Sequence, residues 1–122
     1  MSNIDRKARI REYKETPRPA GVYRVRNSMR GKSLIGSTID IPSMLNRHRF
    51  QLENGLHPDK ELLGDWNEIG ADAFEFETLD QLEPSDKPAY DPTEDLAVLK
   101  SMWIEKLTAS GETLYQQSKR YT

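Results

Sequence analysis

The sequence predicts one small domain with an α/β fold of the α+β kind, in which a three-stranded antiparallel or mixed sheet is flanked by helices. Three observations predict it. Two short strands, at residues 21–26 and 33–36, are separated only by a tight turn, which makes them antiparallel neighbours. In a third segment, at 74–79, aromatic and acidic residues alternate as in a strand, and its aromatic side can be buried only if it pairs with the other two strands. Three further segments carry apolar residues at helical spacing and can cover such a sheet.

The hairpin lies in the first half of the chain. Residues 2–15 favour a helix with a thin apolar stripe, and the run Thr16-Pro17-Arg18-Pro19 ends it because proline disfavours helix in the residue before it. From Gly21 to Arg26 apolar and charged residues alternate, as in a half-exposed strand. Residues 27–31 supply the turn, and Ser33 to Gly36 form the returning strand.

Helices dominate the second half. A helix is predicted near 42–54, with Pro42 in its first turn and Gly55 after its end, and a second near 59–69, closed by Gly70. After the third strand, a polar, proline-containing loop leads to a last helix near 94–107. The tail is polar, with Tyr115 as a candidate contact to the rest of the domain.

We therefore divide the chain into three parts: an N-terminal helical arm (1–19), a folded domain (20–116) and a polar tail (117–122). At 122 residues this is one domain by size.

The net charge of −2 conceals two oppositely charged halves. Residues 1–50 hold 12 Lys and Arg against 4 Asp and Glu, whereas residues 51–122 hold 6 against 16. The basic half includes Arg24, Arg26 and the pair Arg47 and Arg49, so it predicts contacts with phosphates. The other interpretation is that the two halves neutralise each other across the fold.

The amino-acid composition limits the kinds of site that the protein can contain and the compartments in which we expect it. There is no cysteine, which excludes disulfides and thiolate metal sites and is typical of a reducing cytoplasm. The sequence contains no long apolar run and no apolar leader behind a basic start, so we expect a cytoplasmic protein with no membrane partner.

Several motifs occur together in a characteristic order. Gly21-Val22-Tyr23 and Leu34-Ile35-Gly36 resemble the paired signature of the GIY-YIG nucleases, with the second tyrosine replaced. Further segments fall at the spacing of that family within residues 20–116: Arg47-His48, His57, Trp66-Asn67-Glu68-Ile69-Gly70, Phe74-Glu75-Phe76 and Trp103-Ile104. Residues 46–52 also resemble a short bacterial branch of the family that contains little beyond this domain.

The resemblance implies a GIY-YIG-like fold and a hydrolase that cuts phosphodiester bonds. It implies one divalent metal, Mg²⁺ or Mn²⁺, held by a helix glutamate, an arginine that faces the phosphate, and tyrosines near the attacking water. Such a metal stabilises the charge on the leaving group, the arginine binds the phosphate, and a phenol or imidazole moves protons.

Several of these positions carry other residues here. Tyr23 keeps the first tyrosine, but the second falls on Leu34, which has no proton to give. The arginine position falls on Met44, and the metal-binding glutamate falls on Lys100, whose ammonium would repel a divalent cation. The late asparagine falls on Gln116. We therefore expect no metal and no cofactor unless the chain is an active nuclease.

Two residues could compensate for these losses. Arg47 lies three residues after Met44, one helical turn on, so it can share that face of the helix. Lys100 could place a fixed positive charge where the family places its metal. The candidate catalytic residues are Tyr23, Arg47 and His57.

The candidate binding residues share a cationic or imidazole side chain; they are His48, Lys100, Arg24 and Arg26. For each candidate a structural role stays open: Tyr23 as a core aromatic, for example, or Arg47 as a solvated side chain.

Three functions are compatible with this pattern. The first is a protein of GIY-YIG type that has lost most or all metal-dependent endonuclease activity and binds nucleic acid or a protein partner. The second is a divergent, active endonuclease that hydrolyses DNA. It expects Tyr23, Arg47 and His57, with or without Lys100, to gather in one concave pocket. The third is a protein-interaction module that uses its acidic half.

Overall fold

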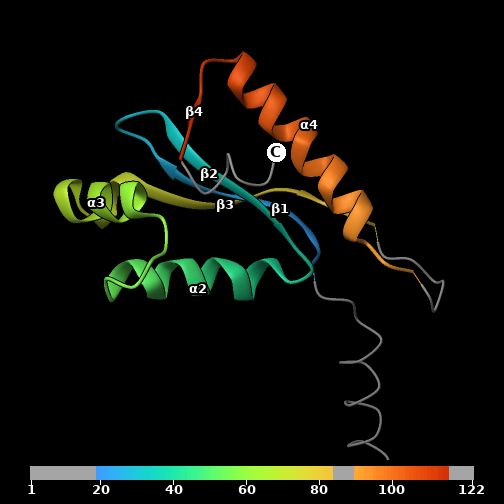
Figure 1. The fold of residues 1–122 in the computed structure, drawn as a ribbon, viewed down its shortest axis with the longest axis horizontal. Helices are drawn as coiled ribbons and strands as arrows, with labels where there is room; N and C mark the ends of the chain where they lie inside the picture. The colour runs from blue at the N-terminus through green and yellow to red at the C-terminus, as the bar shows by residue number, and fades with distance from the viewer. Residues whose placement is uncertain (1–18, 84–89, 116–122) are drawn as a thin grey trace, which may run out of the picture.

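The computed structural model describes residues 19–83 and 90–115, drawn in colour in Figure 1. Its elements follow the order β1 (Gly21–Asn27), β2 (Lys32–Thr38), α2 (Ile41–Glu53), α3 (Lys60–Ile69), the 3-10 turn η1 (Ala71–Ala73), β3 (Phe74–Gln81), α4 (Thr93–Ala109) and β4 (Thr113–Leu114). The helix predicted within residues 2–15, part of the loop after β3, and Gln116 lie outside the described residues.

The sheet has four strands, in the order β3-β1-β2-β4, and not the three that the sequence predicts. β1 pairs antiparallel with both β2 and β3, and β4 pairs parallel with the start of β2. The missed strand is two residues long, too short to show an alternating pattern. It is held by long-range bonds, such as the one from the Tyr115 amide to the Ser33 carbonyl at 2.9 Å.

The β1–β2 hairpin is closed by side-chain chemistry in its turn. The amide oxygen of Asn27 accepts hydrogen bonds from the backbone amides of Met29 (3.1 Å) and Arg30 (3.2 Å). Gly31 then takes the left-handed conformation, with φ at 61°, which glycine adopts without strain. The predicted hairpin is therefore present, with longer strands than expected.

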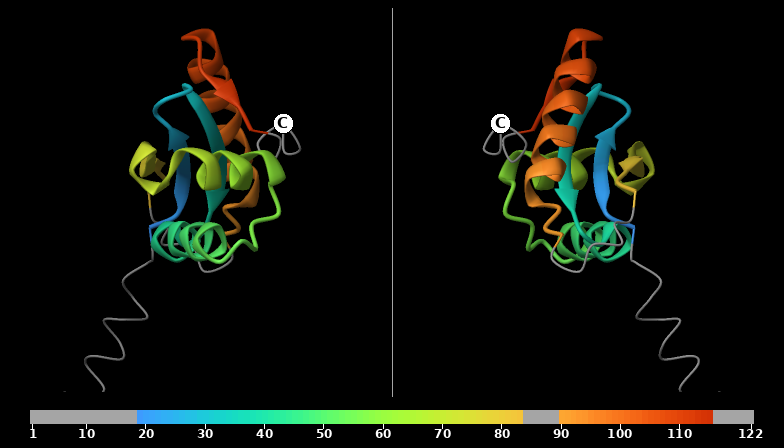
Figure 2. Two further views of the ribbon diagram at one scale, coloured as in Figure 1. Left: turned by 90° about the vertical axis from the view of Figure 1, so that its left-hand side faces the viewer. Right: turned by 90° about the vertical axis from the view of Figure 1, so that its right-hand side faces the viewer.

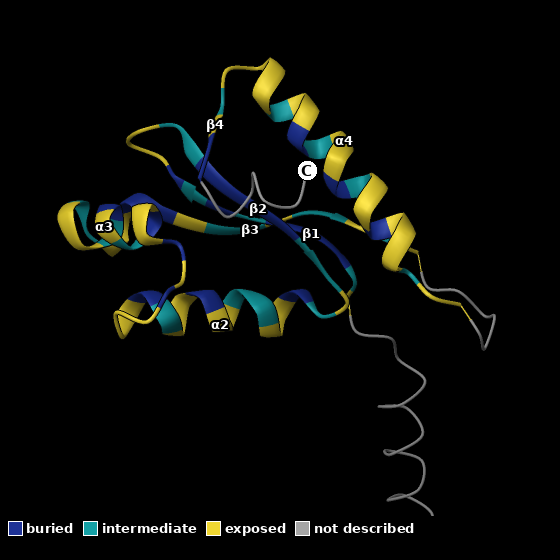
Figure 3. Cartoon of the chain, in the orientation of Figure 1, coloured by how far each residue is buried: buried dark blue, intermediate teal, exposed yellow. Residues whose placement is uncertain are grey.

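Helices cover both faces of the sheet. Figure 1 shows α2 and α3 on one side of the strands and α4 on the other, and the views of Figure 2 agree. In Figure 3 the buried residues of α2 and α4 face the sheet. Consecutive residues of β1 point to opposite faces: Tyr23 joins the core under α2 and α3, and Val22 joins the core under α4.

The two helices that the sequence places between the second and third strands begin at capping aspartates. Asp40 accepts from the Ser43 amide at 3.3 Å at the start of α2, and Asp59 accepts from the Leu62 amide at 3.1 Å at the start of α3. The end of α3 at Gly70, with φ at 101°, agrees with the predicted boundary.

Ion pairs join the two charged halves of the sequence. Arg24 pairs with Glu77 at 2.5 Å, and Arg26 pairs with Glu112 at 2.9 Å. The hairpin's other cations do the same: Arg30 contacts Asp65 and Lys32 contacts Glu61. This pairing supports the interpretation that the halves neutralise each other.

Within residues 19–83 and 90–115, no helix combines the length and the apolar character needed to cross a lipid bilayer.

Candidate functional site

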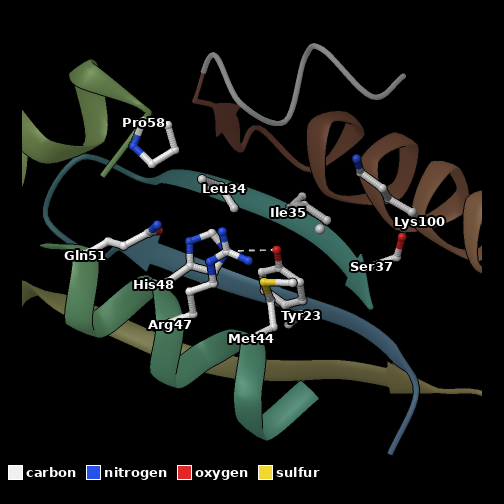
Figure 4. Close-up of a pocket in the computed structure, with 11 residues that line it drawn as sticks. Tyr23, Leu34, Ile35, Ser37, Met44, Arg47, His48, Gln51, Pro58 and Lys100 are labelled. Carbon is white, nitrogen blue, oxygen red and sulfur yellow. Dashed lines mark hydrogen bonds between the residues drawn. The ribbon is translucent and has the colours of Figure 1, made fainter. Parts of the chain in front are cut away.

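A pocket of about 370 Å³ lies along β2, between α2 and α4. Figure 4 shows side chains reaching it from one side on α2 and from the other side on α4. Its lining combines apolar, polar and cationic groups: Tyr23, Leu34, Ile35, Gly36, Ser37, Met44, Arg47, His48, Gln51, Pro58 and Lys100.

The glycines of the paired motifs make room for the tyrosine. Gly36 lies directly opposite Tyr23 in the β1–β2 register. A Cβ atom on Gly36 would lie 2.3 Å from the Tyr23 hydroxyl oxygen, so only glycine lets the phenol cross the neighbouring strand. A Cβ atom on Gly21 would lie 2.0 Å from the Asp80 carbonyl oxygen of β3, next to the irregularity in register at Val22 and Tyr23. The two glycines of the paired motifs thus leave the space that the Tyr23 side chain needs to reach the pocket.

Behind the phenol, two histidines form a chain of hydrogen bonds. The Tyr23 hydroxyl lies 2.9 Å from His48 Nε2, the contact dashed in Figure 4. His48 Nδ1 lies 2.8 Å from His57 Nε2, and His57 Nδ1 accepts from the backbone amide of Asp59 at 3.0 Å.

This geometry sets the direction of every bond in the chain. Because His57 Nδ1 accepts from an amide, it carries no proton, so the ring proton of His57 is on Nε2 and is donated to His48 Nδ1. The ring proton of His48 is then on Nε2 and is donated to the Tyr23 oxygen. Protonating either ring would set two N–H groups against each other. We call this chain, from the Asp59 amide through His57 and His48 to Tyr23, the histidine relay.

Burial keeps both rings neutral. Burial, with smaller contributions from the neighbouring His57 and Arg47, lowers the pKa of His48 to about 4. Burial also lowers the pKa of His57, against an opposing effect of Asp59. His57, a predicted catalytic residue, is fully buried and lies behind His48, so it reaches the pocket only through that ring.

The positively charged groups of the pocket come from opposite sides of β2. Arg47 is exposed on α2, one turn after the half-buried Met44, and both line the pocket as their spacing predicts. Lys100 comes from α4 and is only 5% exposed; burial lowers its pKa to about 8. Leu34 is buried in the core beneath α2 and lines the same pocket.

The residues present do not fit a divalent metal. None of the described residues that line the pocket carries a carboxylate. Among residues 19–83 and 90–115, no group of three His, Asp or Glu side chains could hold a metal ion. The imidazole nitrogens of His48 and His57 are all engaged in the histidine relay. A metal would thus meet Lys100 in place of the carboxylate that a hard cation needs.

The structure brings together Tyr23, Arg47, His48 and Lys100 from the predicted set, with His57 behind them. Arg24 and Arg26 do not line the pocket and lie in the ion pairs with Glu77 and Glu112. Sequence reasoning missed Gln51 and Ser37 as pocket residues. Gln51 was detectable because it follows Arg47 by four residues on the same helical face.

Neither a protein-family model nor a curated protein matches the sequence. Two solved structures do match in fold. One is a single-residue variant of the catalytic domain of the intron endonuclease I-TevI, with a TM-score of 0.62 and 23% identity over 80% of this chain and 92% of that one. The other is the catalytic domain of the homing endonuclease I-TevI, with a TM-score of 0.61 and 23% identity over 77% of this chain and 94% of that one. The chain therefore has a GIY-YIG-like fold, that of a nuclease catalytic domain.

Proposed function

We propose that the pocket binds the phosphate backbone of a nucleic acid without a metal ion, and that the chain has lost or strongly reduced metal-dependent endonuclease activity. The observation that carries this proposal is the position of Lys100. Lys100 is a buried cation that lines the pocket at the position where the resemblance to GIY-YIG nucleases implies a metal-binding glutamate. None of the lining residues that the structure describes is acidic.

The charge of the pocket supports an anionic ligand. Arg47 and Lys100 approach from α2 and α4, and within residues 19–83 and 90–115 no acidic side chain lines the pocket. A phosphate there would receive charge-assisted hydrogen bonds, which are stronger than those between neutral groups. The hairpin cations are already paired with carboxylates, so the pocket is the better candidate for phosphate contact.

The histidine relay gives Tyr23 a defined role in this proposal. Because its oxygen accepts the hydrogen of His48, the hydroxyl proton of Tyr23 is not used on that histidine. A phosphate oxygen in the pocket can compete for this proton. Neutral His48 cannot take the Tyr23 proton through Nε2, since that nitrogen already carries one. The relay thus favours a phenol that binds an anion over one that extracts a proton from water.

Binding at different salt concentrations tests the proposal. Fluorescence anisotropy of labelled single-stranded and duplex oligonucleotides would be measured with chelator present, for the natural chain and for Arg47→Gln. If Arg47 contacts a phosphate, its loss weakens binding about tenfold and lowers the slope of log affinity against log salt by about one unit.

Arg49→Gln is the matched control. Arg49 is on the same helix, but its guanidinium lies 4.5 Å from the centre of the Phe76 ring, and it does not line the pocket. Equal effects of the two substitutions, or binding without salt dependence, would refute phosphate binding in the pocket.

A divergent, active endonuclease is the second candidate. It is favoured by the gathering of Tyr23, Arg47 and Lys100 in one pocket. Under this alternative, incubation with DNA or RNA and Mg²⁺ or Mn²⁺ yields cleavage that Tyr23→Phe abolishes. Our proposal expects no cleavage above that of the Tyr23→Phe protein. The acidic half gains no such support, because Glu61, Glu77 and Glu112 already pair with the hairpin.

A further inference from the structure

Lys100 lies on the face of α4 toward the sheet, between two apolar residues of the same face. The buried residues of α4 are Leu96, Lys100 and Ile104, spaced by four on the face toward the sheet. Lysine side chains are rarely buried to this extent. Lys100 is 5% exposed and lines the pocket. Figure 4 shows it reaching over β2 on the side of Ile35.

Burial favours the uncharged form of this amino group, which is the form that can act as a nucleophile. With a pKa lowered to about 8, about a quarter of the Lys100 side chains are uncharged at pH 7.5, against about one in a thousand for an ordinary lysine. Desolvated lysines of this kind attack carbonyl carbons to form imines.

We propose that Lys100 forms an imine with the aldehyde of a deoxyribose that has lost its base, in a nucleic-acid strand held in the pocket. This inference rests on the proposed binding of a phosphate backbone. A sugar without its base opens to an aldehyde at C1′ between two phosphates, so it combines the electrophile that Lys100 needs with the anion that Arg47 can bind. No metal, oxidant or other cofactor is required.

The step is balanced by loss of water. The nitrogen lone pair of uncharged Lys100 adds to C1′, and a proton moves from nitrogen to the former aldehyde oxygen, which gives a carbinolamine. That oxygen then leaves as water together with the remaining proton of the nitrogen, and the nitrogen lone pair forms the C=N double bond that joins Lys100 to the sugar. Water reverses the reaction and restores the amine and the aldehyde.

Reductive trapping tests the proposal on the full chain. An oligonucleotide with one base-less deoxyribose is mixed with the protein and sodium cyanoborohydride, which reduces an imine to a stable amine. The cross-linked product is measured by gel and its site by peptide mass spectrometry. From the uncharged fractions above, Lys100 should trap up to about 200 times faster than an ordinary exposed lysine.

Substitutions of Lys100 and of a second lysine on α4 test whether the cross-link forms at Lys100. Lys100→Gln and Lys100→Arg should both lose the cross-link, and Lys106→Gln should keep it, because Lys106 lies over the Trp103 ring outside the pocket. Circular dichroism checks that the two Lys100 variants fold, and mapping on the natural chain needs no variant.

A cross-link spread over several lysines, or none at all, overturns the proposal. The intact oligonucleotide could still bind with a salt dependence that Arg47→Gln lowers, while no cross-link forms. In that case only the imine proposal is refuted. If binding itself is absent, the proposed function fails with it.

Discussion

The neutral state of the histidine relay predicts how stability depends on pH. His48 has a pKa near 6.5 in an unfolded chain and about 4 in the fold, because burial disfavours the charged ring. Above pH 6.5 the ring is neutral in both states and contributes no pH dependence. As pH falls below 6.5 the unfolded chain takes up the proton first, so stability is lost progressively down to about pH 4.

The size of the effect follows from the two pKa values. Between pH 7 and pH 5, the free energy of unfolding should fall by about 2 kcal/mol through His48 alone. Because His57 is also buried with a lowered pKa, its contribution has the same sign.

Urea denaturation at the two pH values measures this quantity. His48→Gln keeps a side chain that can hydrogen-bond to Tyr23 and His57 but cannot titrate, so it should lose about 2 kcal/mol less than the natural chain on going from pH 7 to pH 5. Equal losses in the two proteins would refute the account of two neutral, buried rings.

Three further predictions concern packing and burial. Gly36→Ala should destabilise the fold by about 1–3 kcal/mol because its methyl group meets the phenol opposite. Gly64→Ala should stabilise the fold by up to about 1 kcal/mol, because the added methyl group meets nothing within 4 Å apart from the backbone of its own helix. Thermal denaturation of both variants checks the pair, and equal shifts would contradict the steric argument. Tyr115→Phe removes the 2.7 Å hydrogen bond that Tyr115 donates to buried Asp65, so it should lower the free energy of unfolding by about 1–3 kcal/mol. Urea denaturation measures this change, and an unchanged midpoint would show that the bond contributes nothing to stability. Lys100→Leu should raise stability at pH 7 by roughly 3 kcal/mol while weakening oligonucleotide binding. At pH 7 the amino group is charged in both states and its burial costs free energy, a cost that is lost as pH rises from about 8 to 10.5. A Leu variant that is less stable at pH 7 would contradict this reasoning.

The strands, turns and helices that position the site were largely predictable from local patterns. The alternation in β1, the polar turn after it and the apolar stripes of α3 and α4 all encode their structures within a few residues. β4 was not predictable, because its two residues are held by pairing with β2, about 80 positions away in the sequence. Tyr115, the residue after β4, is fully buried. Its hydroxyl donates a hydrogen bond to Asp65 and accepts one from Asn27.

The candidate site was only partly predictable. Helical spacing indicated that Arg47 shares a face with Met44, and the pocket contains both. The histidine relay depends on the loop between α2 and α3, which folds His57 back against His48, and no local pattern predicts that contact. Charge counting could not separate the two interpretations of Arg24 and Arg26, because their partners come from β3 and from the residue before β4.

We propose that the side chain of Lys100 takes the place of a metal ion in a phosphate-binding pocket. The most direct test is to measure oligonucleotide affinity by anisotropy in chelator and again with Mn²⁺, for the natural chain and for Lys100→Glu. We predict that the natural chain binds equally well in both conditions, and that Lys100→Glu loses binding in chelator. Binding by the natural chain that requires Mn²⁺, or that is accompanied by strand cleavage, would contradict the claim.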